Sequence, residues 1–319
     1  MSEQQGRPSA GAVHLSIVSP VYRAEDCLDE LVRRISAAAS PLTDSFEIVL
    51  VNDGSPDNSW AVIERLAAKD PRVRGVALTR NFGQHHAITA GLRESRGEWV
   101  VVMDCDLQDR PEEIPRLYER AMEGNECVMA RRVHRKDTAG KVAGSRLFYK
   151  VFNYLTDLHF DGTVANFSII SRRVANALTS MPESVRFYGG FLQWMGFANS
   201  FLDVQHDSRF AGESSYTFLR LLRFGSDIIL AYSDKPLRIC VTVGFGIAVV
   251  SVIAGIGYLI RALFFGIPVM GWASLIITLF FSTGAIIFTL GILGLYIARI
   301  FAEVKGRPHY LVRSRTFAA

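Results

Sequence analysis

Two aspartates that follow an apolar run are the residues best suited to chemistry in this 319-residue chain. Asp104 and Asp106 come directly after Val100–Met103. If the extended backbone continues, alternate side chains point the same way, so both carboxylates face one site. Such hard oxygen ligands suit Mg²⁺ or Mn²⁺ shared with a bound diphosphate. Gln108 and Asp109 follow closely enough to complete the coordination shell, and the alternative interpretation is an ordinary surface turn.

A further carboxylate ends another apolar run. Asp53 follows Ile48–Val51 and precedes Gly54 and Ser55, which favour a turn. The carboxylate could accept a hydrogen bond from the imino N–H of a uracil or guanine base. It could equally close a turn or cap a helix of its own chain. Tyr22 could stack on such a base or pack in the core.

Arginines in two segments could bind phosphate groups. The segment Arg131–Lys136 contains three arginines and a lysine, and Ser208–Tyr216 contains Arg209, Gly212 and Ser214. Arginine can bind a phosphate through two parallel hydrogen bonds, and the second segment could close over a diphosphate. The alternative for the first segment is a solvated basic loop.

The elements that must position these residues alternate between strand-like and helix-like patterns. The strand-like runs are Leu15–Val21, Phe46–Val51, Val73–Thr79, Trp99–Met103 and Cys127–Ala130. Helical patterns lie between them, at about 24–39, 58–68, 84–95 and 112–123. This order predicts an α/β domain with a mostly parallel sheet covered on both faces. Ligands of such sheets bind beyond the carboxyl ends of the strands, where Tyr22, Asp53 and Asp104 fall.

Two long uncharged runs near the C-terminus predict membrane-spanning helices. Ile239–Ile260 and Trp272–Ala298 each exceed the ~20 residues that a helix needs to cross a hydrocarbon core. Two buried core helices are the alternative. Basic residues flank the two runs, whereas the connection between them holds only Arg261, so both flanks are expected in the cytoplasm. The N-terminus shows no basic segment followed by an apolar core, so no export of the large domain is expected.

The net charge and the spacing of the cysteines argue against a nucleic-acid-binding protein and against a cysteine metal site. The net charge of +4 comes without a concentrated basic block, so a nucleic-acid partner is not indicated. Cys27, Cys105, Cys127 and Cys240 lack metal-ligand spacing and are expected to be free thiols.

These patterns divide the chain into seven expected parts. They are a flexible tail (1–13), a cytosolic domain (14–207), a diphosphate loop with amphipathic juxtamembrane helices (208–238), a first span (239–260), an extracytoplasmic loop (261–271), a second span (272–298) and a cytosolic tail (299–319).

With their neighbours, these motifs resemble the GT-A glycosyltransferases of family 2. The segments that carry the resemblance are Ser19–Tyr22, Val51–Ser55, Arg80–Gly83, Met103–Asp109, Arg209–Ser214 and Glu303–Pro308. Within that family the chain is most similar to the polyprenyl-phosphate glycosyltransferases, such as bactoprenol glucosyltransferases and dolichyl-phosphate mannose synthases. The resemblance implies a GT-A (Rossmann-like) domain followed by amphipathic juxtamembrane helices and two transmembrane helices.

The resemblance also implies roles for single residues. Those expected to hold the nucleotide are Pro20, Tyr22 and Asp53. Those expected to hold Mg²⁺ or Mn²⁺ and the diphosphate are Asp104, Asp106 and Gln108. Those expected to serve the acceptor phosphate or the donor diphosphate are Arg131, Arg209 and Ser214.

The chain departs from the family pattern at several positions. It has Arg23-Ala24 where the family usually has Asn-Glu, and Asn166–Ser168 where Asp-Phe-Arg is frequent. It also has Ser215 in place of a Lys, and Lys141-Val142 in place of a Lys-Arg pair. These departures leave the sugar open and weaken any role for residue 166 as a base.

The resemblance implies inverting transfer of a hexose, with UDP-glucose preferred, to undecaprenyl phosphate. The enzyme would be a multi-pass protein of the inner (plasma) membrane with a cytoplasmic catalytic domain, supplying a lipid-linked sugar for cell-envelope glycan or lipopolysaccharide modification. Small residues in Gly244–Gly246 and Gly291–Gly294 could pack helices closely, and a homo-oligomer is expected.

Three alternatives remain open. The donor could be another UDP- or GDP-sugar (an amino sugar, GlcNAc or mannose). A non-catalytic nucleotide-sugar-binding membrane scaffold would keep the pocket without turnover. A processive polysaccharide synthase would need more spans and a Gln-x-x-Arg-Trp motif, where this chain has Leu192-Gln193-Trp194.

Overall fold

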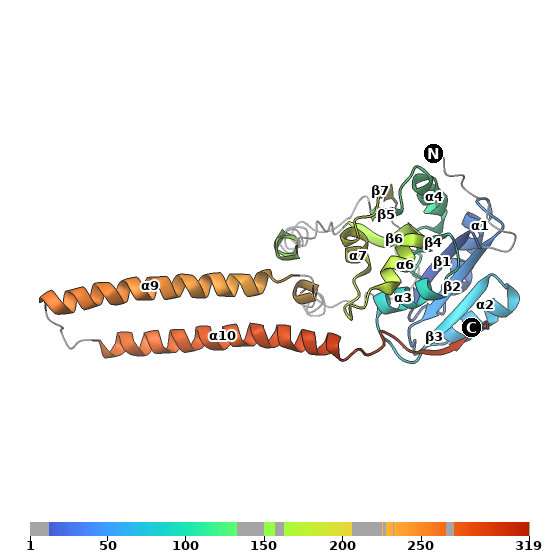
Figure 1. Ribbon diagram of the computed structural model, residues 1–319. Coiled ribbons are helices and arrows are strands. Elements are labelled where there is room, and N and C mark those ends of the chain that lie inside the picture. The colour runs from blue at the N-terminus through green and yellow to red at the C-terminus, as the bar shows by residue number, and fades with distance from the viewer. Residues whose placement is uncertain are drawn as a thin grey trace. The chain divides into compact units, whose positions relative to one another are not determined.

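The computed structural model describes residues 13–132, 150–156, 163–205, 225, 228–231, 233–265 and 271–318 (Figure 1). It divides into two compact units. The first comprises Met1–Lys150, Leu158–Tyr216 and Arg307–Ala319, and the second comprises Val151–Asp157 and Thr217–Gly306. The chain therefore leaves the first unit and returns to it at its C-terminal end.

The first unit is built on an eight-stranded mixed sheet with the strand order β7-β5-β6-β4-β1-β2-β3-β8. The strands are β1 (Leu15–Val21), β2 (Phe46–Asn52), β3 (Val73–Leu78), β4 (Trp99–Val102), β5 (Cys127–Arg132), β6 (Val164–Ser171), β7 (Asn199–Val204) and β8 (Val312–Arg315). Strands β1 to β4 run parallel. Strand β6 is antiparallel to both β4 and β5, so β5 runs in the same direction as β1 to β4.

Helices cover both faces of this sheet. They are α1 (Leu28–Ala39), α2 (Ser59–Lys69), α3 (Gln84–Glu94), α4 (Ile114–Met122, preceded by a 3₁₀ turn Pro111–Glu113), α6 (Arg172–Ser180) and α7 (Tyr188–Trp194). Side chains of α1, α2 and α4 share one core with alternate residues of the strands. On the other face α3 contacts β1 and β2, and α6 contacts α3 and β4. Strands β1 and β2 are buried along their whole length, as a parallel sheet covered on both faces requires. The predicted fold class is confirmed.

The predicted strands begin where the structure has them, and β2, β3 and β4 end within one residue of their predicted ends, whereas the first helix and the fifth strand differ by more. The first helix begins at Leu28 and not near Ala24, because backbone N–H groups of the segment before it donate hydrogen bonds to side chains near the start of α2. The backbone N–H of Ala24 donates to Ser59 Oγ at 3.1 Å, and that of Glu25 donates to Asp57 Oδ2 at 3.3 Å. Strand β5 continues to Arg132, beyond its predicted end.

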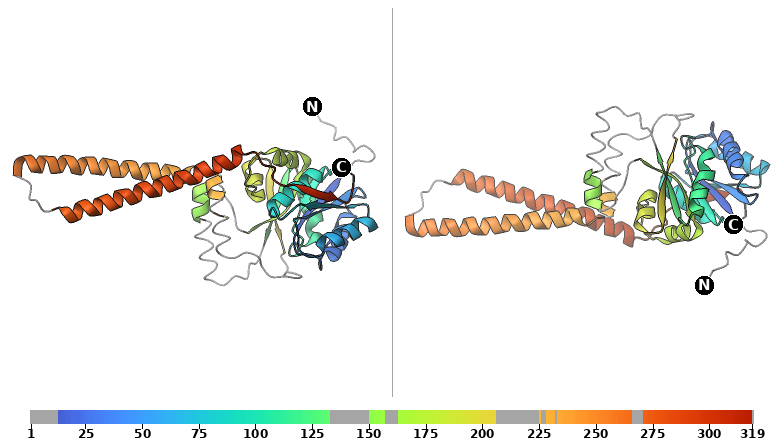
Figure 2. Two further views of the ribbon diagram at one scale, coloured as in Figure 1. Left: turned by 90° about the horizontal axis from the view of Figure 1, so that it is seen from below. Right: turned by 90° about the horizontal axis from the view of Figure 1, so that it is seen from above.

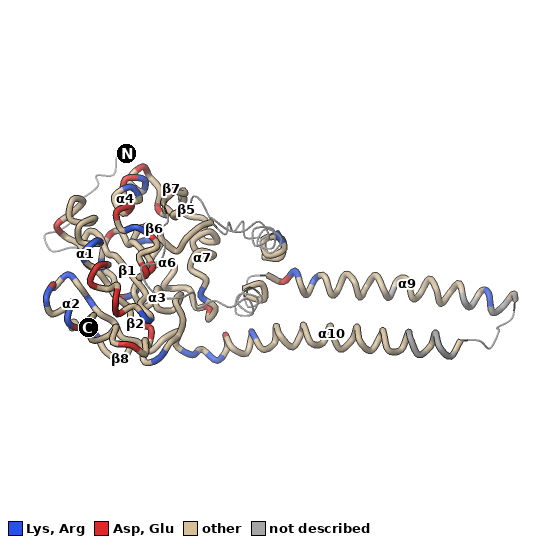
Figure 3. The backbone as a smooth tube through the Cα atoms, turned by 180° about the vertical axis from the view of Figure 1, so that it is seen from behind, with Lys and Arg blue, Asp and Glu red and all other residues tan. Residues whose placement is uncertain are grey.

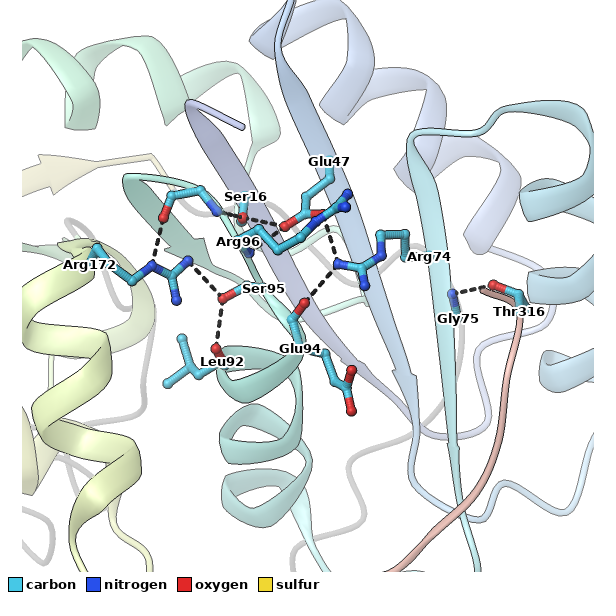
Figure 4. Close-up of polar contacts among 11 residues, drawn as sticks. Ser16, Glu47, Arg74, Gly75, Leu92, Glu94, Ser95, Arg96, Arg172 and Thr316 are labelled. Atoms are coloured by element: carbon cyan, nitrogen blue, oxygen red, sulfur yellow. Dashed lines mark hydrogen bonds and ion pairs between the residues drawn. The ribbon is translucent and has the colours of Figure 1, made fainter. Parts of the chain in front are cut away.

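A buried carboxylate joins the amino ends of neighbouring strands (Figure 4). Glu47 of β2 accepts hydrogen bonds from Ser16 Oγ at 2.7 Å, Arg74 Nη1 at 2.8 Å and the backbone N–H of Arg96 at 2.6 Å. Ser16 Oγ also accepts from the backbone N–H of Gly97 at 2.7 Å. Burial alone would raise the pKa of Glu47, but these hydrogen bonds and the charge of Arg74 bring it below its usual value. The carboxylate is therefore ionised and fixes β1, β2, β3 and the entry to β4 together.

The C-terminal segment completes the sheet at its β3 edge. Figure 2 shows this segment, in red, lying along the sheet, where β8 pairs antiparallel with β3. Thr316 Oγ1 accepts from the backbone N–H of Gly75 at 2.8 Å, and Arg315 pairs with Glu94 of α3 at 2.6 Å. The guanidinium of Arg74 lies 3.7 Å from the ring centroid of Phe317. The chain end is therefore part of the sheet and of its amino-edge network.

The second unit contains two long apolar helices, α9 (Lys235–Phe265) and α10 (Trp272–Val304). Their candidate spans, Lys235–Gly257 and Thr278–Val304, have mean hydropathies of 2.5 and 2.1. Figure 3 shows the Lys, Arg, Asp and Glu residues of these helices gathered near their ends. By length and composition both could cross a membrane. Most of the segment 208–238, expected to form juxtamembrane helices, lies outside the described residues.

Substitution of Gly91 tests the packing of α3 on the sheet. A Cβ atom there would lie 2.3 Å from Val18 Cγ1 and 3.1 Å from Val51 Cγ2. Gly→Ala inside a helix normally stabilises by up to about 1 kcal/mol. Here we expect Gly91→Ala to lower the free energy of unfolding by about 1–3 kcal/mol, because overpacking outweighs the helix propensity. Denaturant unfolding followed by circular dichroism measures the change, and a variant at least as stable as the wild type would contradict this packing.

Candidate active site

The loops that follow β1, β2, β3, β4 and β5 lie at one edge of the sheet, because these strands run in one direction. They carry Tyr22 after β1, Asp53 after β2, and Asp104 after β4. Arg131 and Arg132 are the last residues of β5. The topology therefore brings the predicted carboxylates, the aromatic residue and an arginine pair to the same edge.

Asp104 is half-buried directly beyond β4. Its Oδ1 accepts a hydrogen bond from Nε2 of Gln84 at 2.5 Å. Gln84 is the first residue of α3 and was not among the predicted site residues. Its one sequence signal is its position directly after the motif Arg80–Gly83.

The segment from Asp104 to Asp109 turns sharply at Leu107. Leu107 has a φ of 60°, in the left-handed region that costs a non-glycine residue on the order of 1 kcal/mol. Its side chain is buried in the core, which holds the turn in place. Within the turn, Asp106 Oδ1 accepts from the backbone N–H of Gln108 at 3.1 Å. A leucine gives no sequence signal for such a turn, so its role could not be predicted.

Asp109 is fully buried and forms an ion pair with Arg132. Arg132 Nη2 lies 3.2 Å and 3.1 Å from the two carboxylate oxygens, and Nε lies 3.3 Å from Oδ1. Sequence reasoning offered Asp109 as a further metal ligand, and the structure gives it an arginine partner on its own chain. Arg132 was not singled out from the sequence.

Arg131 lies on the opposite face of β5, because successive strand residues point to opposite sides. Its Nε donates to Asp203 Oδ1 at 2.6 Å, and the two residues are cross-strand neighbours in β5 and β7. Both side chains are about half exposed. The structure therefore places Arg132, and not the predicted Arg131, beside the aspartate segment, and a phosphate-binding role for Arg131 stays a prediction.

The aspartates at this edge repel one another. Burial and the negative charges of Asp109 and Asp106 raise the pKa of Asp104 to about 7, and Arg132 and the Gln84 hydrogen bond offset this only in part. A divalent cation would relieve the repulsion, and Mg²⁺ or Mn²⁺ binds through one or two carboxylates together with ligand phosphates. Asp104 and Asp106 fit such an ion. Among the described residues, no group of three or more His, Cys, Asp or Glu side chains is arranged as a metal site by itself.

Asp53 binds its own chain. Its Oδ1 accepts from the backbone N–H of Phe82 at 2.7 Å, and Oδ2 accepts from that of Gly83 at 2.9 Å. The side chain is buried, and burial raises the pKa of Asp53 despite these two bonds. Gly54 has a φ of 60°, and a Cβ atom there would lie 2.4 Å from the backbone carbon of Arg80. Asp53 and Gly54 therefore fix the turn 80–83 against the end of β2, and a bond from Asp53 to a base stays a prediction.

The loop after β1 is tied to the loop after β2. Pro20 is buried within β1, opposite Val51, whereas Tyr22 is exposed. Arg23 has a φ of 53°, and its backbone N–H donates to Ser55 Oγ at 2.8 Å. Asparagine adopts this left-handed conformation more readily than arginine, which explains the Asn of the family pattern at this position. Arg209 and Ser214, expected to bind the diphosphate, lie outside the described residues.

Comparison with known families identifies the class of protein. The model of glycosyl transferase family 2 matches residues 16–178, which include the ends of β1 to β5. The chain belongs to this family, as its motifs predicted.

Two relatives are similar over almost the whole chain. The undecaprenyl-phosphate 4-deoxy-4-formamido-L-arabinose transferase of Shewanella sediminis is 37% identical over 302 residues, which cover 94% of this chain and 91% of the relative. The bactoprenol glucosyl transferase of Shigella phage SfX is 34% identical over 302 residues, which cover 94% and 99%.

A solved structure supports the fold. Glucosyl-3-phosphoglycerate synthase from Mycobacterium tuberculosis, in complex with Mn²⁺, UDP and phosphoglyceric acid, matches with a TM-score of 0.51 and 19% identity. The match covers 71% of this chain and 83% of that one. The predicted GT-A fold is confirmed.

Asp53→Asn tests the role of Asp53 within the protein. An amide can accept one of the two N–H bonds but turns its own N–H₂ toward the other donor. We expect the free energy of unfolding of the ligand-free protein to fall by about 1–3 kcal/mol, because a buried N–H loses its acceptor. Asp44→Asn, in an exposed turn, is the control and should change nothing measurable. Unchanged stability of Asp53→Asn would favour a carboxylate that serves the ligand alone.

The raised pKa of Asp104 predicts a dependence of stability on pH. Its pKa is about 7 in the folded protein against an ordinary value of 3.8, so the folded protein holds this proton longer. The contribution of Asp104 to stability therefore falls as the pH rises from about 4 to about 7 and stays constant above that. Thermal unfolding in EDTA should show this decline, and Asp104→Asn should remove it.

Metal binding should show the opposite trend, because the cation competes with the proton on Asp104. We expect Mn²⁺ to raise the melting temperature more at pH 8 than at pH 6. An equal shift at both pH values would argue against Asp104 as a ligand.

Proposed function

We propose that the protein transfers a hexose from a nucleotide-diphosphate sugar, UDP-glucose first among the candidates, to undecaprenyl phosphate with inversion at the anomeric carbon. The observation that carries the proposal is the pair Asp104 and Asp106 at the carboxyl edge of a family 2 glycosyltransferase sheet. Similarity along 94% of the chain to two transferases named for polyprenol carriers supports the acceptor.

The aspartate segment would bind the donor diphosphate. In this proposal Asp104 and Asp106 hold Mg²⁺ or Mn²⁺, with Gln108 beside them. When bound, the ion neutralises the charge that develops on the diphosphate leaving group. Gln84 keeps Asp104 oriented through its 2.5 Å hydrogen bond, and the turn at Leu107 fixes Asp106 relative to it. The crystallised synthase of the same fold holds Mn²⁺ and UDP, which supports a divalent ion and a uridine nucleotide.

The acceptor needs positioning more than proton abstraction. A phosphate monoester has a second pKa of about 6, so its oxygen is mostly ionised near neutral pH. Asn166, where the family often has Asp, is therefore compatible with transfer. Arginine binds phosphate through paired N–H groups. The ion pair with Asp109 holds Arg132 beside the aspartate segment, whereas Arg131 pairs with Asp203, so we propose Arg132 rather than Arg131 for the contact with the acceptor phosphate. Arg209 and Ser214 remain proposed for the diphosphate.

The nucleotide would lie over the loops after β1 and β2. Tyr22 is exposed there and can stack on a base, while Pro20 shapes the end of β1 from inside the sheet. Asp53 would affect base binding indirectly, because its hydrogen bonds to the backbone N–H groups of Phe82 and Gly83 fix the turn 80–83.

The apolar helices would place this reaction at the cytoplasmic face of the inner membrane. The chain belongs to the first unit both over Leu158–Tyr216 and from Arg307 onward, so a membrane-crossing helix pair between these points must begin and end on the same side. That topology agrees with the distribution of basic residues and supports a multi-pass protein with its catalytic domain in the cytoplasm. We also propose a homo-oligomer, packed through the small residues of the two helices.

The test uses the full-length protein in detergent with undecaprenyl phosphate, Mg²⁺ or Mn²⁺, and a panel of UDP- and GDP-sugars. We expect one donor to give a glycosyl-phosphoryl-polyprenol, detected by mass spectrometry and abolished by EDTA. Nucleotide binding without product from any donor would favour the non-catalytic scaffold.

Asp106→Ala tests the metal assignment in the same assay. We expect transfer to fall by at least about a hundredfold, because the leaving group loses its main electrostatic partner. Asp44→Ala, an exposed aspartate in the turn before β2, should keep wild-type activity. An active Asp106→Ala enzyme would refute the assignment.

A further inference from the structure

Arg23, in the loop after β1, has a backbone conformation that an arginine seldom adopts. Its φ of 53° lies in the left-handed region, and in the part of the chain that the structure describes Leu107 is the other non-glycine residue with a positive φ. Leu107 is held in the core, whereas the side chain of Arg23 is exposed. Backbone strain of this kind is concentrated at binding and catalytic sites.

Hydrogen bonds to the loop after β2 hold the strained backbone in place. The N–H of Arg23 donates to Ser55 Oγ at 2.8 Å, and the N–H of Ser55 donates to Asn52 Oδ1 at 3.0 Å. The N–H of Ala24 donates to Ser59 Oγ at 3.1 Å. The direction in which the Arg23 side chain leaves the backbone is therefore set by contacts between two loops at the carboxyl edge of the sheet.

The guanidinium of Arg23 lies over the ring of Tyr22, with Cζ 5.6 Å from the ring centroid. Within the described ranges, no residue forms a hydrogen bond or an ion pair with this guanidinium. Arg33 of α1, by contrast, is paired with Glu30 at 2.6 Å. The N–H donors of Arg23 are therefore available to a ligand, and they lie beside an exposed aromatic ring.

We propose that Arg23 donates hydrogen bonds to the keto oxygen of the nucleobase, O4 of uracil or O6 of guanine, while Tyr22 stacks on the base. The base takes the ring face that the guanidinium covers in the structure, and the guanidinium moves to the edge of the base. This inference rests on the proposed function, in which a nucleotide lies over these two loops.

The chemistry of the guanidinium decides which bases it favours. A guanidinium donates hydrogen bonds and accepts none. Uracil and guanine present a carbonyl oxygen at the position where cytosine and adenine present an amino group, which is itself a donor. Arg23 therefore favours UDP- and GDP-sugars over CDP- and ADP-sugars.

A contact with the base differs from simple attraction between opposite charges. The diphosphate is common to all four nucleotides, so an arginine that bound the diphosphate alone would raise the affinity for each of them equally. A lysine at position 23 would keep the positive charge but lose the planar group and its fixed N–H donors. Discrimination between keto and amino bases is therefore the property that identifies the contact.

The test measures the binding of UDP, CDP, GDP and ADP, each with Mn²⁺, to the full-length protein in detergent by calorimetry. We expect the wild type to bind UDP more tightly than CDP, or GDP more tightly than ADP, according to the nucleotide it uses. In Arg23→Asn this preference should fall by about tenfold or more, because a hydrogen bond from a charged group is lost. Arg23→Lys should lose most of the preference although it keeps the charge.

Controls separate this effect from a loss of folding. Arg23→Asn should melt at or above the wild-type temperature, since asparagine adopts the left-handed conformation more readily than arginine. Arg33→Gln, which removes an exposed charge from α1, should keep the wild-type preference.

Three outcomes would overturn the inference: an unchanged preference in Arg23→Asn, an equal loss of affinity for all four nucleotides, or a wild type that binds none of them. A protein that shows the preference, loses it in Arg23→Asn and yet transfers no sugar to undecaprenyl phosphate would count against the proposed function alone.

Discussion

A parallel sheet can gather its loops at the carboxyl edge only while its strands keep their register, and here one buried carboxylate fixes the amino edge. Glu47 accepts bonds from Ser16, Arg74 and the backbone of Arg96, so β1, β2, β3 and the entry to β4 meet at one ionised group. Breaking a buried ion pair by removing one partner costs about 3–5 kcal/mol, far more than losing an exposed pair. The geometry of the opposite edge therefore depends on a group that lies away from the site.

The carboxyl edge differs from the amino edge in its electrostatics, because its negative charges are only partly compensated by positive groups. Asp109 is paired with Arg132, but Asp104 has a neutral amide as its hydrogen-bond donor and two like charges nearby. The turn at Leu107 adds backbone strain in the same segment. Such costs are typical of functional sites, where the surrounding structure must supply the stability that the site itself lacks. The dense core under α1 and α4 and the network around Glu47 supply it here.

The sequence could predict where the site lies but not which atoms meet there. Apolar runs that end in polar clusters are local patterns, so the positions of Asp53 and Asp104 at strand ends were predictable. The partner of Asp53 was not, because the N–H of Phe82 comes from a turn after the next strand. The difference between Arg131 and Arg132 depends on cross-strand neighbours, which one sequence does not reveal. Strand β8 escaped prediction because its four residues, Val-Arg-Ser-Arg, contain no apolar run.

The position of β8 has a consequence for synthesis of the chain. The backbone N–H of Gly75 donates a hydrogen bond to Thr316 Oγ1, although the two residues are 241 positions apart in the chain. At a translation rate of about 5–20 residues per second, β3 waits on the order of ten to fifty seconds for its neighbour. During that time both apolar helices emerge while one edge of the sheet is still open, and open strand edges favour pairing with other chains. Ribosomes translating one message in close succession would present several such edges together, so protection of nascent β3 is a requirement set by the topology.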